Sequence, residues 1–124
     1  MIIAIIAHDG KKAEMVQFLN ENAEVLHQNE IELVSTGTTG TKVEKAGFKV
    51  DKMLSGPLGG DAQIASLVAS GKCGMVIFFR DPLDKHPHEP DISMPMRICD
   101  VHDVPLATNP ASANLLFSGL VNKS

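Results

Sequence analysis

Residues 1–7 form an uninterrupted apolar run that contains four isoleucines. A strand that is apolar at every position is buried on both faces, as in a parallel sheet with helices on either side. Residues 75–79 repeat this pattern, and three further strand patterns occupy residues 31–35, 48–54 and 105–108. A helical pattern follows each strand. The first predicted helix starts near residue 11, and the other four span residues 41–47, 61–69, 92–101 and 111–121.

Five strand-then-helix units with short connections are typical of an open α/β sheet. We therefore predict a single domain over residues 1–124, with a mainly parallel five-stranded sheet and helices on both of its faces. The length and the hydrophobic content of 44% are sufficient for one core.

The composition excludes several classes of function. The net charge is −4, no block of basic residues occurs, and both Trp and Tyr are absent, so we expect no nucleic-acid partner. The first apolar run is too short to span a bilayer and lacks the basic flank of a signal peptide. We therefore expect a soluble cytoplasmic protein without a membrane partner. Cys73 and Cys99 lack metal-ligand spacing and are expected to be reduced and partly buried.

A glycine-rich stretch, Ser-Gly-Pro-Leu-Gly-Gly-Asp at residues 55–61, must be a loop, because three glycines and a proline destabilise a helix or strand interior. A helix follows it, so Asp61 lies at a helix start, where backbone N–H groups and the helix dipole stabilise a carboxylate. The glycines would let another molecule approach the main chain closely. Asp61 is therefore either an N-cap residue or a functional acid.

The polar residues of the chain concentrate at the carboxyl ends of four predicted strands. In parallel α/β sheets these ends lie at one edge, and ligands bind there. We therefore predict an active site along this edge. The four groups are His8, Asp9 and Lys12; Thr36, Thr38 and Thr39; Ser55, Gly56, Gly59, Gly60 and Asp61; and Asp81, His86, His88 and Asp91.

Residues 36–40, Thr-Gly-Thr-Thr-Gly, offer hydroxyl and backbone N–H donors near a helix start, which suits a phosphate. Lys12 could supply the matching positive charge. The pattern matches neither the dinucleotide fingerprint nor the Walker sequence, so a nucleotide is a weaker interpretation. An ordinary helix cap and a solvated lysine are the structural alternatives.

The predicted edge also carries several carboxylates. Acids that lie close together disfavour the ionised form of one another, which can supply a base that accepts a proton. For Asp9 and Asp91, simple helix capping is the alternative interpretation. The four acids are Asp9, Asp61, Asp81 and Asp91.

Two histidines lie in a proline-rich loop. His88 is flanked by Pro87 and Glu89-Pro90, so it is held on a stiff segment that suits a hydrogen-bond donor, although an exposed loop histidine is the simpler interpretation. His86 and His88 could chelate a metal, and His8-Asp9 is similar to a pair found in metal phosphohydrolases. No third ligand is identified, so we expect neither a metal nor any other cofactor.

Taken together, these segments strongly resemble the methylglyoxal synthase family. The resemblance covers nearly the whole chain in one order and spacing. It implies a Rossmann-like three-layer sandwich, a homohexamer, and a cofactor-free lyase that converts glycerone phosphate to methylglyoxal and inorganic phosphate. The matching segments are Ala7-His8-Asp9 with Lys12, residues 36–40, residues 54–61, residues 78–83 with Pro87-His88, and residues 105–109.

The resemblance also implies roles for individual residues. Asp61 would be the base that removes a proton from the hydroxymethyl carbon of the substrate. His8 and His88 would contact the substrate, with His88 near its carbonyl and hydroxyl oxygens. Asp9, Asp81 and Asp91 match further catalytic positions. The phosphate group, which as the free ion is a product or inhibitor, would be surrounded by Lys12, Thr36, Gly37, Thr38, Thr39, Ser55 and Gly56.

Two other functions remain open. The sequence also resembles the allosteric domain of carbamoyl phosphate synthetase, which binds nucleotides or small effectors without catalysis. Such a module would need the threonines and Lys12 but would have no use for Asp61 beside His88, so catalysis is favoured. A plain α/β interaction protein would leave the polar edge without a purpose.

Overall fold

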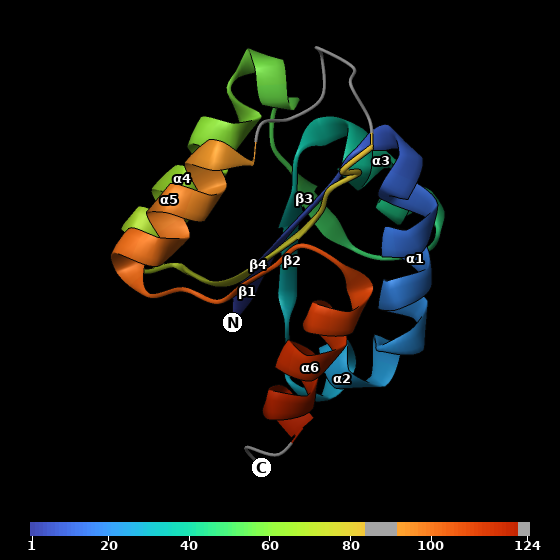
Figure 1. Cartoon of the computed structure of the whole chain (residues 1–124). Coiled ribbons are helices and arrows are strands. Elements are labelled where there is room, and N and C mark those ends of the chain that lie inside the picture. Colours follow the sequence, from blue (N-terminus) through green and yellow to red (C-terminus); the bar gives the residue numbers. More distant parts are fainter. Residues whose placement is uncertain (84–91, 122–124) are drawn as a thin grey trace.

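The computed structural model describes residues 1–83 and 92–121. Its centre is a five-stranded sheet in the order β3-β2-β1-β4-β5, and every strand pair is parallel. Figure 1 shows the sheet between two layers of helices, so the predicted three-layer α/β architecture is confirmed. The strands are β1 (Ile2–Ala7), β2 (Glu32–Ser35), β3 (Val50–Lys52), β4 (Cys73–Phe79) and β5 (Leu106–Ala107).

The helices divide unequally between the two faces of the sheet. One face is covered by α1 (Lys12–Glu21), α2 (Ala23–Gln28), α3 (Gly37–Lys45) and α6 (Pro110–Val121). The other is covered by α4 (Gly60–Ala69) and α5 (Ser93–His102). Two short 3₁₀ helices, η1 (Asp9–Lys11) and η2 (Gly56–Leu58), follow β1 and β3.

The first strand is the centre of the core. Residues 3–7 are all buried, with Ile3 and Ile5 facing the α1 side and Ala4 and Ile6 facing the α4 side. β1 pairs with β2 on one edge and β4 on the other, which leaves it no exposed edge. The continuous apolar run therefore has the structural reason that the sequence predicts.

Three aromatic rings fasten the α1 face. Phe18 meets Phe79 edge-to-face at 5.6 Å between ring centroids, and it meets Phe117 in the same way at 4.8 Å. These contacts join α1, β4 and α6 around buried apolar area, and edge-to-face pairs add about 0.5–1.5 kcal/mol beyond burial.

Several element boundaries differ from those predicted. α3 begins at Gly37 rather than residue 41. Thr36 is extended (φ −68°, ψ 156°), and residues 36–40, which we call the threonine turn, form the first helical turn. α2 is an additional helix, separated from α1 at Asn22 (φ −113°, ψ 19°). Pro95 and Pro110 both lie in first helical turns, where a missing N–H costs no helical hydrogen bond.

None of the helices in residues 1–83 and 92–121 is both long and apolar enough to cross a membrane.

Candidate active site

The order of the strands places a topological switch point at the centre of the sheet. The chain runs outward from β1 to β2 and β3, then crosses back to β4 and continues to β5. The segments after β1 and β4 therefore leave their shared edge in different directions, and α/β proteins bind ligands in the crevice that this creates. These segments begin with His8 and Arg80.

The threonine turn lies beside the glycine-rich stretch of residues 55–61, which we call the glycine turn. Met53 N–H donates to Ser35 O at 2.7 Å, and Gly37 N–H donates to Leu54 O at 3.3 Å. A β-carbon at Gly37 would lie 3.2 Å from Met53 O, so a side chain there would press on the neighbouring backbone. The fold thus brings two segments with polar side chains and accessible backbone to one place.

Glycine is required in the turn before α4. Gly59 is left-handed, with φ +108°, and Gly60 N–H donates to Ser55 O at 3.0 Å. A β-carbon at Gly60 would lie 1.9 Å from Leu54 O, which is too close for any side chain. The turn is therefore folded tightly against the start of α4.

Asp61 is the second residue of α4, because the N-cap position belongs to Gly59. The simple N-cap interpretation of Asp61 is therefore wrong. The residue is only 8% exposed, and it lies at the positive end of the helix dipole. The positive end of the dipole attracts negative charge at this position.

Lys12 and Asp9 form an ion pair across η1 and the start of α1. The lysine side chain is 12% exposed and the aspartate side chain is 77% exposed, so Lys12 is not the solvated lysine of the structural alternative. Asp9 caps neither helix, since the N-cap positions of η1 and α1 are His8 and Lys11. The carboxylate of Asp9 therefore acts on Lys12 rather than on a helix end.

His8 joins the two segments at the switch point. Its backbone N–H donates to Phe79 O at 3.1 Å, and its ring Nδ1 accepts the backbone N–H of Asp81 at 2.8 Å. The side chain of Asp81 turns back to its own loop, where Oδ1 accepts the N–H of Leu83 at 3.1 Å. The histidine is thus positioned by the strand beside it.

The threonines of the turn differ in their partners. Thr39 is buried; its Oγ1 accepts the N–H of Ala7 at 3.1 Å and donates to Ala7 O at 3.3 Å. Thr36 Oγ1 is also buried, but among the described residues it has no hydrogen-bond partner. Thr38 is exposed. The Thr39 hydroxyl therefore holds α3 against β1, and of the other two threonines only Thr38 is exposed.

Gln63 is a residue that the sequence did not single out. Its Oε1 accepts the backbone N–H of Leu54 at 2.8 Å, so it fixes the strand end beside the glycine turn from within α4. An isolated glutamine in a helix carries no sequence signal for this role.

The predicted residues His86, His88 and Asp91 lie outside the described residues, so the roles expected for them stay predictions. Within the described ranges, 1–83 and 92–121, no group of three His, Cys, Asp or Glu side chains could hold a metal ion.

The two cysteines are buried on the α4 side of the sheet. Burial, together with the neighbouring Cys73 and Asp100, raises the pKa of the Cys99 thiol to about 11. Burial also raises the pKa of Cys73. Neither thiol is therefore poised as a nucleophile.

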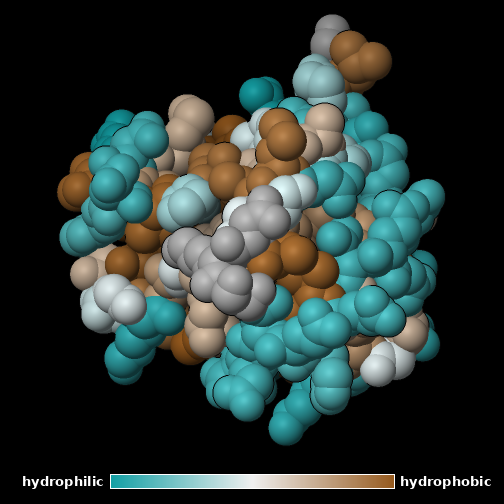
Figure 2. All heavy atoms as spheres, turned by 90° about the horizontal axis from the view of Figure 1, so that it is seen from below, coloured by the Kyte–Doolittle hydropathy of each residue, from teal (hydrophilic) through white to brown (hydrophobic). Residues whose placement is uncertain are grey.

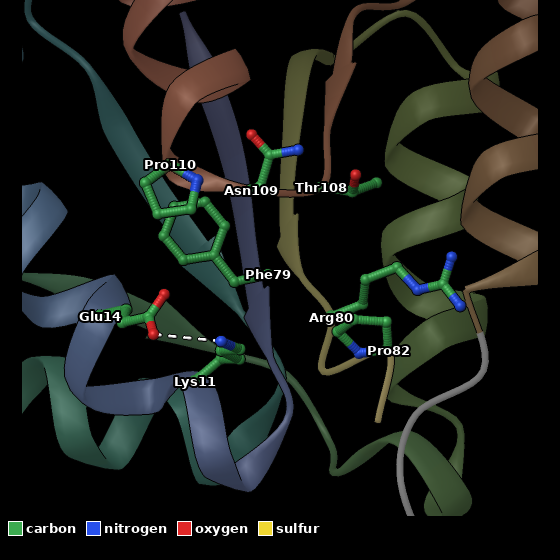
Figure 3. Close-up of a pocket in the computed structure, with 8 residues that line it drawn as sticks. All are labelled: Lys11, Glu14, Phe79, Arg80, Pro82, Thr108, Asn109 and Pro110. Atoms are coloured by element: carbon green, nitrogen blue, oxygen red, sulfur yellow. Dashed lines mark hydrogen bonds and ion pairs between the residues drawn. The ribbon is translucent and has the colours of Figure 1, made fainter. Parts of the chain in front are cut away.

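A hollow of about 360 Å³ opens near the carboxyl ends of β4 and β5 (Figure 3). One wall holds the ion pair of Lys11 and Glu14, at 3.1 Å, while the guanidinium of Arg80 points away from that pair. Of the predicted site residues that the structure describes, none lines the hollow. The lining residues are Lys11, Glu14, Phe79, Arg80, Pro82, Thr108, Asn109 and Pro110.

Comparison with known proteins gives a consistent result. A family model described as "MGS-like domain" matches residues 15–108. The methylglyoxal synthase of Moorella thermoacetica is 55% identical over 118 residues, which cover 94% of this chain and 91% of the relative. The methylglyoxal synthase of Acholeplasma laidlawii is 52% identical over 124 residues, covering 99% and 100% of the two chains.

A solved structure shares the fold. The crystal structure of methylglyoxal synthase from Elizabethkingia anophelis NUHP1 superimposes with a TM-score of 0.89 at 39% sequence identity. The match covers 94% of this chain and 76% of that chain.

Proposed function

The chain belongs to the methylglyoxal synthase family, and from this premise we propose how its carboxyl edge performs the family's reaction. The enzyme is a lyase that converts glycerone phosphate to methylglyoxal and inorganic phosphate. The reaction requires a base, hydrogen-bond donors that stabilise an enediolate, and a site that binds the phosphate group and stabilises it as it leaves. We also propose a cytoplasmic location, since a charged phosphate ester does not cross a membrane unaided.

Asp61 is the proposed base, supported by its burial at the start of α4. It would take a proton from the hydroxymethyl carbon of glycerone phosphate. A C–H next to a ketone is a far weaker acid than a carboxylic acid, and each pKa unit of mismatch costs about 1.36 kcal/mol. Hydrogen-bond donors must therefore stabilise the enediolate oxygens, a role we assign to His8 and His88.

The proposed phosphate site is the start of α3 together with the glycine turn. The buried hydroxyl of Thr36, the exposed Thr38 and the backbone of the first turn of α3 provide donors. The adjacent Ser55 and Gly56 lie across the Gly37–Leu54 hydrogen bond. Lys12 adds positive charge, which the Asp9 carboxylate orients. The remaining proposed contacts are the main-chain atoms of Gly37 and Thr39, since the Thr39 hydroxyl is bonded to Ala7.

Elimination follows if the bridging C–O bond stands out of the enediolate plane. The terminal hydroxyl first gives its proton to the oxygen of the former ketone. The terminal oxyanion then becomes an aldehyde, the double bond moves toward the carbon that carries the phosphate, and the phosphate leaves with the electron pair of the C–O bond. The enol that remains takes up a proton at its terminal carbon, loses its hydroxyl proton and becomes methylglyoxal. Charge on the departing phosphate is stabilised by Lys12 and the α3 terminus. The remaining two proposed catalytic acids are Asp81 and Asp91.

The direct test incubates the purified chain with glycerone phosphate and follows methylglyoxal and inorganic phosphate together. Equal yields of the two products are expected. Binding of glycerone phosphate without release of either product would instead indicate a regulatory module, and the proposal would fail.

Replacing Lys12 by Ala is expected to weaken the binding of inorganic phosphate and to raise KM for substrate, each by about 10-fold or more, since one charge-assisted contact contributes roughly 1.5–3 kcal/mol. Lys11→Ala is the matched control, because the adjacent Lys11 pairs with Glu14 on the wall of the hollow. Isothermal titration with phosphate and steady-state kinetics measure both variants. Equal affinities in the two variants would remove Lys12 from the phosphate site.

Two isosteric substitutions separate binding from structure in the threonine turn. Thr39→Val leaves the N–H of Ala7 without its acceptor and is expected to lower the free energy of unfolding by about 1–3 kcal/mol. Thr36→Val removes a hydroxyl with no described partner, so it should keep stability but weaken phosphate binding. Urea unfolding and phosphate titration report the two effects. The opposite pattern would exchange the two assignments.

We propose that the enzyme is a homohexamer. Large apolar side chains are exposed on α5 and α6, namely Val101, Leu115 and Val121, and contacts with further copies would cover them. Figure 2 shows apolar side chains gathered on the face seen from below, bordered by hydrophilic ones. Light scattering after gel filtration should give six chain masses, and a monomer would contradict the proposal.

A further inference from the structure

The ring of His8 is held by a group that can only donate. The backbone N–H of Asp81 points at Nδ1 over 2.8 Å, and an amide N–H has no lone pair to accept a hydrogen bond. Nδ1 must therefore present its own lone pair. In a neutral imidazole only one nitrogen carries a proton, so the proton of this ring is on Nε2.

The ring has little freedom to turn over and exchange its two nitrogens. His8 is only 9% exposed, and its ring stands edge-on to Phe78, at 5.4 Å between centroids and an interplanar angle of 88°. Its backbone is fixed to β4 by the hydrogen bond to Phe79 O. The neighbouring strand thus sets both the place and the orientation of the imidazole.

The donating amide is itself held in place. Asp81 Oδ1 accepts the N–H of Leu83 at 3.1 Å, which closes a tight turn directly after β4. The other carboxylate oxygen lies against Gly10, where an added β-carbon would be 2.9 Å away from it. The segments after β1 and β4 therefore contact each other twice, through the His8 ring and through the Asp81 carboxylate.

We propose that the main-chain amide of Asp81 is a positioning group that fixes His8 as the neutral Nε2–H tautomer, which donates to an oxygen of the enediolate. This inference rests on the proposed function, in which His8 contacts glycerone phosphate. A backbone amide cannot titrate, so the tautomer is set by the fold rather than by a neighbouring acid.

The neutral form suits elimination. A neutral imidazole is a weak acid, so it stabilises the enediolate oxygen by a hydrogen bond that strengthens as charge develops there. An imidazolium would instead transfer its proton to that oxygen. The electrons that must expel the phosphate would then be held in a neutral enediol. A donor with a fixed Nε2–H therefore keeps the intermediate reactive.

The first test reads the tautomer without any substrate. Nitrogen-15 NMR of the histidine-labelled enzyme, with His8 assigned from the signals missing in His8→Gln, should show Nε2 protonated and Nδ1 unprotonated at neutral pH. Asp81→Asn keeps the same backbone N–H and an acceptor oxygen, so the same pattern is expected in that variant. A proton on Nδ1 in the wild-type enzyme would overturn the proposal. Product formation by that enzyme would still support the proposed function, so the two failures can be told apart.

The second test uses two amide side chains that imitate different nitrogens of the ring. His8→Asn places an oxygen near the position of Nδ1 and leaves no donor at Nε2, so kcat should fall by about 10²-fold. His8→Gln can place an N–H near Nε2 and should recover about 10-fold of that loss. Thermal unfolding checks that both variants fold. Wild-type kcat in both would refute the donor role, while loss of product from the Asp61 variant would still support the proposed function.

Discussion

Asp61→Asn is expected to lower kcat by about 10³-fold or more, with little change in KM. Proton transfer by a positioned base contributes about 10²–10⁴-fold, and no other described carboxylate lies at the start of α4 to replace it. Asparagine keeps the shape of the side chain but cannot accept the proton at carbon. Because the proposed phosphate site lies at the start of α3 and the glycine turn, affinity for phosphate should persist. Steady-state kinetics and titration with inorganic phosphate measure the two effects separately.

Asp51→Asn is the matched control, since Asp51 is an exposed aspartate on the edge strand β3. It undergoes the same chemical change away from the proposed site and should retain wild-type kcat. Exchange of the substrate's hydroxymethyl protons with solvent deuterium should also disappear in Asp61→Asn. Normal turnover or normal exchange in that variant would show that the base is another residue.

Gly60→Ala is expected to have the largest effect on stability. Its β-carbon would lie 1.9 Å from the carbonyl oxygen of Leu54, and a backbone carbonyl cannot move aside as a flexible side chain can. Overpacking typically costs about 1–3 kcal/mol, and a backbone clash this close should exceed that range. The glycine turn would also move relative to Asp61, so kcat should fall by about 10²-fold even in the fraction that folds.

The control for this variant is Gly119→Ala in α6. Apart from the chain neighbours of Gly119 and the backbone of its own helix, no described atom lies within 4 Å of the β-carbon position there. Alanine is a better helix former than glycine by about 1 kcal/mol. The same substitution should therefore destabilise the chain at one site and stabilise it at the other. Urea unfolding measures both changes. A Gly60→Ala variant as stable and active as the wild type would show that the turn can adjust.

The fold was predictable because its strands are unusually apolar. β1 and β4 are buried on both faces, so their sequences lack the alternation that would make a strand ambiguous. Parallel pairing then places all carboxyl ends at one edge. The adjacency of the threonine and glycine turns follows from that arrangement, since β2 and β3 are neighbours in the sheet.

Other features could not be predicted because they depend on contacts between distant residues. The start of α3 was placed too late because a Thr-Gly sequence is typical of both a loop and a first helical turn. The roles of Thr36 and Thr39 differ only because β1 lies beside one of them. Gln63 and the amide of Asp81 act through single hydrogen bonds to remote positions, which leave no pattern in the sequence.

The position of β1 has a consequence for how the molecule is made. The central strand, β1, precedes the other four strands in the chain, and its second partner, β4, ends only at Phe79. The ring of His8 receives its hydrogen bond from the amide of Asp81, which lies 73 positions further along the chain. Contacts of such separation form late and slowly. A nascent chain therefore cannot hold the ring of His8 in its final position until β4 and the turn after it have been synthesised.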